Sequence, residues 1–236
     1  MLYFTPVEDE RKNSLAIAMW SIRANLVPMA ILWLLAVAMV LAYYRFASVA
    51  AALEPLAKWQ AECGWSASFL NRLFFAGVVP GIFLVTVKAL KVRYPLRVAC
   101  AQGVWCGLWG ILCGWFYELQ ALVVGNDVSL STLLLKTAID QFVWTVLVVA
   151  PANGAFFLWM GQDFSWTRTR RVWPRRFYSE LVLPILVPNW CLWIPVVVIV
   201  YAFPLPLQVQ VSGLALSASM LLSLSVGRIV GKGKSS

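Results

Sequence analysis

Long apolar runs without a charged residue divide the chain. The first lies between Arg23 and Arg45, and its 21 residues suffice for a helix across a hydrocarbon core about 30 Å thick. Four further uncharged runs follow at 73–87, 98–117, 141–162 and 181–227. The last has 47 residues, too many for one helix, and Pro204 and Pro206 near its middle predict a turn. The pattern therefore predicts an all-α, polytopic membrane helix bundle with six transmembrane helices.

The chain divides into two regions at about residue 72. Residues 1–72 form an N-terminal extension with one transmembrane helix and a segment at 46–71 in which Glu54, Lys58 and Glu62 alternate with apolar side chains. Such alternation predicts a short amphipathic helix on the outer membrane surface. Residues 73–230 form the main helical membrane domain.

Composition supports a membrane location and excludes much enzyme chemistry. Hydrophobic residues make up 61% of the chain and charged residues 12%, and the mean hydropathy is +0.79. The sequence contains no histidine, which removes serine and cysteine triads, histidine-ligated zinc and histidine-ligated haem. The five cysteines include no C-x-x-C pair. We expect no enzyme, no catalytic residues, no cofactor and no metal.

Basic residues collect on alternate loops. If both termini are cytoplasmic, 15 lysines and arginines lie inside and four outside, as the positive-inside rule requires. This topology accounts for the net charge of +9 without a nucleic acid. Five arginines between Arg168 and Arg176 fit the same rule, although they could also bind lipid phosphates or an anionic solute.

Small residues form faces on two predicted helices. Gly103, Gly107, Gly110 and Gly114 share one face of the third span, and Ala215, Ser219, Ser223 and Gly227 do so in the last. Small side chains let a second helix approach closely, so we interpret both faces as helix-packing surfaces. The alternative is a pore wall.

Polar residues at membrane depth are the candidate pore or gate residues. Lys136, Asp140 and Gln141 enter the fourth span together, and their spacing allows Lys136 to pair with Asp140. Asn153 and Asn189 lie close to prolines. Each either hydrogen-bonds to a backbone carbonyl that the proline kink leaves free or lines a pathway. Glu118 closes the third span and is interpreted as an interfacial anchor.

Several motifs resemble the Mpv-seventeen and twenty-two-kilodalton peroxisomal membrane protein family over residues 73–228. Gly114-Trp115-Phe116-x-x-Leu119 is similar to its G-W-Y-x-x-L, and Lys136-x-x-x-Asp140-Gln141 to its K-x-x-x-D-Q. Asn189-Trp190-x-x-Trp193 and Tyr201-Ala202-Phe203-Pro204-Leu205 resemble N-W-x-x-W-P and F-x-V-P-L. Trp115, Trp190, Trp193 and Pro204 are thus the family-motif residues.

The chain departs from the family pattern at several polar positions. Cys113 replaces a frequent histidine, Gln208 replaces an arginine, Val197 replaces a glutamine, and the proline after the tryptophan is displaced to Pro195. The resemblance implies a small helical membrane protein, and some family members are described as channels.

Three functions compete. The resemblance and the polar points favour a channel or pore for small solutes or ions. A non-conducting membrane protein that organises a complex or lipids is the alternative, and a membrane-embedded enzyme comes last. The expected partners are the lipid bilayer and a second copy of the chain, with no nucleic acid. The acidic N-terminus lacks a cleavage site, which favours the bacterial cytoplasmic membrane over a mitochondrial inner or peroxisomal one.

Overall fold

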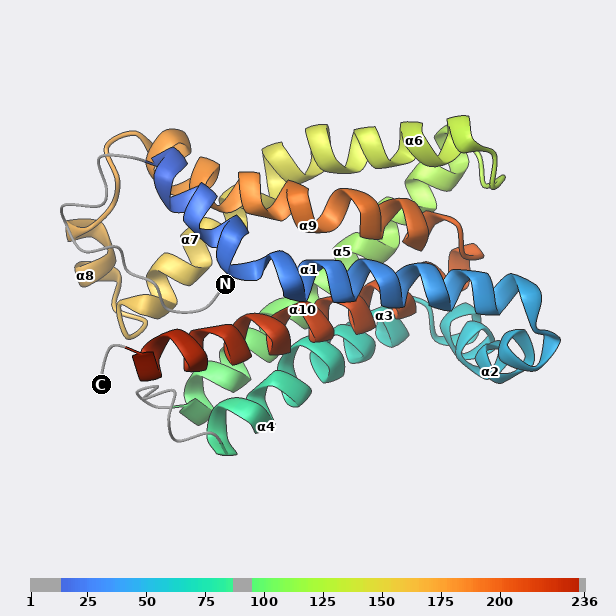
Figure 1. The fold of residues 1–236 in the computed structure, drawn as a ribbon, viewed down its shortest axis with the longest axis horizontal. Helices are drawn as coiled ribbons and strands as arrows, with labels where there is room; N and C mark the ends of the chain where they lie inside the picture. Colours follow the sequence, from blue (N-terminus) through green and yellow to red (C-terminus); the bar gives the residue numbers. More distant parts are fainter. Residues whose placement is uncertain (1–13, 87–94, 234–236) are drawn as a thin grey trace.

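The computed structural model describes residues 14–86 and 95–233, and throughout these ranges helices joined by turns form the chain (Figure 1). In order the elements are α1 (Ser14–Arg45), α2 (Ala47–Cys63), α3 (Trp65–Arg72), the π-helical η2 (Leu73–Val78), α4 (Val79–Thr86), α5 (Pro95–Val123), α6 (Leu130–Ala138), the π-helical η4 (Ile139–Val149), α7 (Ala150–Gly161), α8 (Trp166–Arg171), the π-helical η5 (Tyr178–Val182), α9 (Leu183–Tyr201) and α10 (Leu205–Gly233).

Four helical segments are long and apolar enough to cross a membrane: Trp65–Phe83, Leu96–Val123, Leu130–Gly161 and Tyr178–Tyr201. Met29–Arg45 with Ala47–Cys63 forms a pair bent by 102° that makes a fifth if it counts as one span. The prediction of an all-helical, multi-pass membrane protein is confirmed at this level. The predicted turn is also present, because α9 ends at Tyr201 and α10 begins at Leu205.

The bundle core lies where α1, α5, α9 and α10 meet. Leu32 of α1, Phe116 of α5, Val200 of α9 and Leu207 of α10 belong to one buried apolar cluster. The indole Nε1 of Trp33 donates a hydrogen bond to the carbonyl oxygen of Leu192 at 3.0 Å, which joins α1 to α9. Helices distant in the sequence are therefore neighbours in space (Figure 1).

A corner of α2 and α3 closes one end of the bundle. α2 turns away from α1 at Phe46, and Gly64 separates α2 from α3 with a φ of 52°. This left-handed conformation favours glycine because it has no Cβ. The exposed Glu54–Lys58 ion pair, 2.8 Å long, lies on α2 as the amphipathic pattern predicts. The second membrane-length segment already begins at Trp65, rather than at residue 73, because α3 continues directly into η2.

Each π-helical segment ends two residues before a proline. η2 precedes Pro80, η4 precedes Pro151 and η5 precedes Pro184. A proline has no N–H and its ring clashes with the carbonyl four residues earlier, and a wider turn relieves that clash. Pro188 and Pro195 lie inside α9 without such a segment, so proline alone does not cause it.

The glycine face of α5 packs against α3 and η2. A Cβ on Gly110 would collide with the carbonyl oxygen of Ser68, and one on Gly103 would lie 3.3 Å from the Cα of Gly77. Gly107 meets the ring of Phe69 in the same way. The two helices therefore approach each other almost backbone to backbone.

This close approach predicts the effect of a bulky residue at Gly110. Gly110→Val should destabilise the protein by about 1–3 kcal/mol or more, because the obstacle is backbone rather than a movable side chain. The measurement is the thermal unfolding midpoint and the monodisperse fraction in detergent. Gly161→Val is the matched control, since a Cβ there meets nothing within 4 Å. Equal losses from both variants would contradict the prediction.

Candidate functional site

The interior of the bundle contains many buried polar side chains. Ionisable and amide groups are costly at membrane depth unless they are paired or hydrated. The buried polar side chains come from most of the helices: Gln60, Ser68, Asn71, Arg72, Gln102, Gln120, Lys136, Thr137, Asp140, Gln141, Thr145, Gln208, Gln210 and Ser212.

Asp140 is the centre of one polar cluster. Its Oδ2 accepts a hydrogen bond from the Tyr201 hydroxyl at 2.7 Å. Its Oδ1 accepts from the Gln141 amide at 2.9 Å and from the Thr145 hydroxyl at 3.3 Å. Trp190 donates to the backbone oxygen of Gln141 at 2.8 Å. α9 and η4 thus hold the buried carboxyl group with three neutral donors.

Lys136 does not pair with Asp140, in contrast to the pairing that the sequence suggests. Its ammonium nitrogen lies 5.2 Å from the centroid of the Tyr201 ring and 3.5 Å from Oδ1 of Asn126. The π-helical turns of η4 begin at Ile139, which alters the angular step between positions 136 and 140. Tyr201 therefore contacts both groups: its hydroxyl donates a hydrogen bond to the Asp140 carboxylate, and its ring makes a cation–π contact with the Lys136 ammonium.

Arg72 is buried inside the bundle, although the uncharged run at 73–87 places it just outside a span, in the outer loop before it. The residue is only 6% exposed, and its Nη2 donates a hydrogen bond to the Ser212 hydroxyl of α10 at 2.8 Å. The sequence prediction ends a span at every charged residue, and it therefore placed a boundary at Arg72. Here the helix continues through Arg72 because a polar partner on a neighbouring helix receives the guanidinium.

Amide side chains extend this cluster toward α2. Asn71 donates to Oε1 of Gln210, Gln210 donates to Oε1 of Gln60 at 2.8 Å, and Gln60 donates to the Ser68 hydroxyl at 2.9 Å. These contacts join α2, α3 and α10 inside the bundle. Gly213 makes room for Asn71, because a Cβ at that position would collide with its Oδ1.

Tyr117 connects the two clusters. Its ring packs edge-on against Tyr201 with centroids 5.3 Å apart, and its hydroxyl lies next to Ser212. Tyr117 thus borders Ser212, the partner of Arg72, and Tyr201, the partner of Asp140. Together with these two clusters, the buried polar side chains named above form what we call the polar layer.

Several buried polar atoms in this layer have no hydrogen-bond partner among the described residues. They include Arg72 Nε, Asn71 Oδ1, Gln141 Oε1 and Gln208 Oε1. An unsatisfied buried polar group costs about 1–3 kcal/mol, so native proteins place water or a ligand beside such groups. The layer has the chemistry of a hydrated interior.

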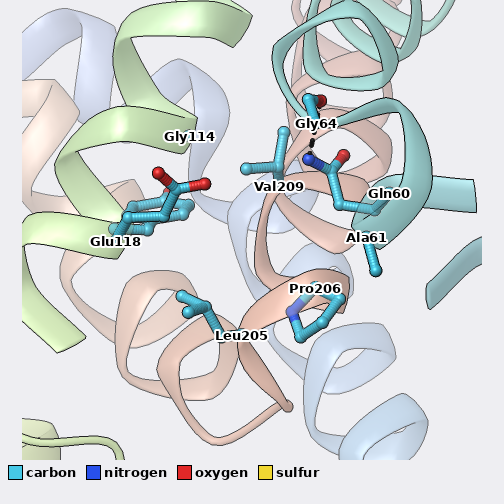
Figure 2. Close-up of a pocket in the computed structure, with 9 residues that line it drawn as sticks. Gln60, Ala61, Gly64, Gly114, Glu118, Leu205, Pro206 and Val209 are labelled. Atoms are coloured by element: carbon cyan, nitrogen blue, oxygen red, sulfur yellow. Dashed lines mark hydrogen bonds between the residues drawn. The ribbon is translucent and has the colours of Figure 1, made fainter. Parts of the chain in front are cut away.

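A cavity of about 140 Å³ opens at the end of the bundle that carries the α2–α3 corner (Figure 2). Gln60, Tyr117 and Glu118 supply its polar side chains. Leu205, Pro206 and Val209 of α10 form an apolar wall. Gln60 and Tyr117 are themselves buried, so they border both the cavity and the buried polar side chains.

The remaining predicted positions lie apart from the layer or at its edge. The Oδ1 of Asn153 accepts a hydrogen bond from Trp105 of α5 at 2.7 Å, which is the structural use of an asparagine beside a proline. Asn189 is half-buried. Among the family-motif residues, Trp115 is exposed, Trp193 packs against the core, and Pro204 lies exposed in the turn before α10.

No protein-family model, no curated protein and no solved structure matches this chain. The resemblance drawn from its motifs therefore stays an expectation.

The sequence gives little indication that several other residues belong to the polar layer. Gln208, Gln210 and Ser212 stand at alternate positions of an apolar run, a spacing that does not place them on one face of a helix. Tyr117 and Tyr201 resemble ordinary interfacial aromatics. Only the packing of the helices shows that they meet.

The Tyr201 hydroxyl should contribute measurably to the free energy of unfolding, because it donates a hydrogen bond to a buried carboxylate. Tyr201→Phe keeps the ring but removes the 2.7 Å hydrogen bond, and it should lower stability by about 1.5–3 kcal/mol. Thermal unfolding in detergent is the measurement. Tyr44→Phe is the control, because Tyr44 donates its hydrogen bond to Ala202 at an exposed position. In an Asp140→Asn background the effect of Tyr201→Phe should shrink; an undiminished effect would show that the hydroxyl does not act on Asp140.

Proposed function

We propose that the chain is a six-span membrane protein with both termini cytoplasmic, and that its polar interior conducts small solutes or ions. α1 and α10 supply the two spans beyond the four membrane-length segments. α10 has 29 residues, about 43 Å of helix.

The observation that supports the proposal is that large apolar side chains are exposed on the outside of the bundle, whereas ionisable side chains are buried inside it. Leu34 is 70% exposed and Leu147 63%, whereas Arg72 and Asp140 are 6% exposed. Apolar side chains toward lipid and ionisable groups toward the interior are the arrangement of proteins that carry polar solutes through a membrane. The unpartnered polar atoms of the layer support a wet interior in the same way.

A non-conducting role in organising a complex or lipids is the second candidate. It needs a free surface of small residues to receive a partner helix. The α5 glycine face is already covered by α3 and η2 of the same chain, which weakens this alternative. A second copy of the chain remains an expected partner through other faces, and the bacterial cytoplasmic membrane remains the favoured location over the mitochondrial inner or peroxisomal membrane.

The distribution of exposed charge predicts the orientation. Arg72 and Lys136 are buried, so the exposed basic side chains at the α2 end reduce to Arg45 and Lys58. The opposite end carries the exposed arginines between Arg168 and Arg176. A reporter that fluoresces only in the cytoplasm should therefore be active when it is fused after Ser236. A reporter active only outside would exclude this topology.

Conduction is tested with the purified full chain in liposomes. Wild-type protein should release a small entrapped electrolyte, and Asp140→Asn should fold but change the rate, because it removes a charge from the polar layer. Arg171→Leu on the exposed α8 is the control and should leave the rate unchanged.

Either of two results would oppose the proposal. One is liposomes that stay tight with folded wild-type protein. The other is release that is identical in wild type, Asp140→Asn and Arg171→Leu, because the solute would then bypass the polar layer.

A further inference from the structure

We propose that the cavity at the α2 end is a binding site for a small protonated amine, with the Glu118 carboxylate as its anionic group and Tyr117 as its aromatic lining residue. This inference rests on the proposed function for its role as an entry site, but binding itself can be measured without transport.

The cavity is built by three parts of the fold that are distant in the sequence. Gln60, Ala61 and Gly64 come from the α2–α3 corner, and Gly114, Tyr117 and Glu118 come from α5. The start of α10 completes it. Gly114 lets α5 pack closely against the corner on the wall of the cavity, because a Cβ there would lie 2.9 Å from the Ser68 hydroxyl.

Glu118 is the charged group of the cavity. Figure 2 shows its carboxylate directed from α5 into the space between α5 and the α2–α3 corner. It forms no ion pair with any side chain that the structure describes. None of the nine lining residues is cationic, so a ligand with a positive charge would supply the missing partner.

The other lining groups favour an organic cation over a hydrated metal ion. Tyr117 lines the cavity, and aromatic rings attract ammonium groups. Leu205, Pro206 and Val209 offer an apolar surface for an alkyl chain. A metal ion would instead require several oxygen ligands converging on one point.

The size of the cavity limits the ligand. Its volume of about 140 Å³ is close to that of an engineered cavity that accepts benzene, about 150 Å³. An alkylamine of about five or six heavy atoms fits such a space.

The electrostatics of this end agree with a cation. Exposed acidic residues outnumber exposed basic ones here, with Glu54, Glu62, Glu118 and Asp127 against Arg45 and Lys58. Hydrogen bonds from Thr132 and Ser129 hold the pKa of the Asp127 carboxyl below its usual range, so it stays charged at mildly acidic pH. Surface charge of one sign raises the local concentration of the opposite ion.

The experiment measures binding of butylammonium chloride to the full-length protein in nanodiscs by ligand-observed NMR, at pH 7. Wild type should bind butylammonium and should not bind sodium butyrate or 1-butanol. Glu118→Gln should weaken binding about tenfold or more, because it removes a charged hydrogen-bond acceptor. Glu62→Gln, which removes an exposed carboxylate outside the cavity, should change binding less than twofold. Ala61→Trp should abolish binding by filling the space.

The outcomes separate this inference from the proposed function. Folded wild type that ignores butylammonium, or a Glu118→Gln variant that binds as wild type does, overturns the amine site. Binding that follows the expected series supports the site even if liposomes stay tight, in which case only conduction is refuted. Release that is normal in Glu118→Gln while that variant loses amine binding supports the site but removes it from the entry path.

Discussion

The structure depends on the need to place Arg72 and Asp140 in a low-dielectric interior without a direct salt bridge. Burying each charge alone would cost several kcal/mol. Here hydrogen bonds from neutral donors and to neutral acceptors lower that cost. Ser212 receives the guanidinium, while Tyr201, Gln141 and Thr145 hold the carboxylate. A direct pair would lock the two helices together. Separated charges, each held by neutral groups, leave both helices without such a lock.

Backbone geometry makes this arrangement possible. The glycine face of α5 brings α3 close enough for Arg72 to reach past α5 toward α10. The π-helical η4 starts one residue before Asp140 and directs its carboxyl toward α9, whereas Lys136 stays in the preceding α-helical turns. Irregular helical geometry next to a polar residue is common at functional positions, and here it lies in a segment that ends two residues before Pro151.

Much of the fold was predictable from the sequence because hydrophobic length is a local property. The long helices, the turn at Phe203–Pro204 and the exposed pair on α2 all follow from local patterns. The prediction was wrong where a polar side chain is satisfied by a distant helix. Arg72 ended a span by the rule of uncharged runs, yet its partner is 140 positions away. Likewise, the spacing that paired Lys136 with Asp140 assumed a regular α-helix, and no local pattern reveals that Tyr201 would serve both groups.

The two ends of the molecule differ in a way that gives the polar layer a direction. Once Arg72 and Lys136 are placed in the interior, the α2 end is acidic on its surface and open through a cavity lined by Glu118, while the α8 end carries the exposed arginines. On the proposed function, a cation would be attracted to the first end and repelled by the buried Arg72. An attractive mouth and a repulsive interior would favour retention at the mouth over free passage. Selectivity would then be set by what lowers the cost of passing the guanidinium, and Asp140 is the buried group among the described residues with the charge to do so.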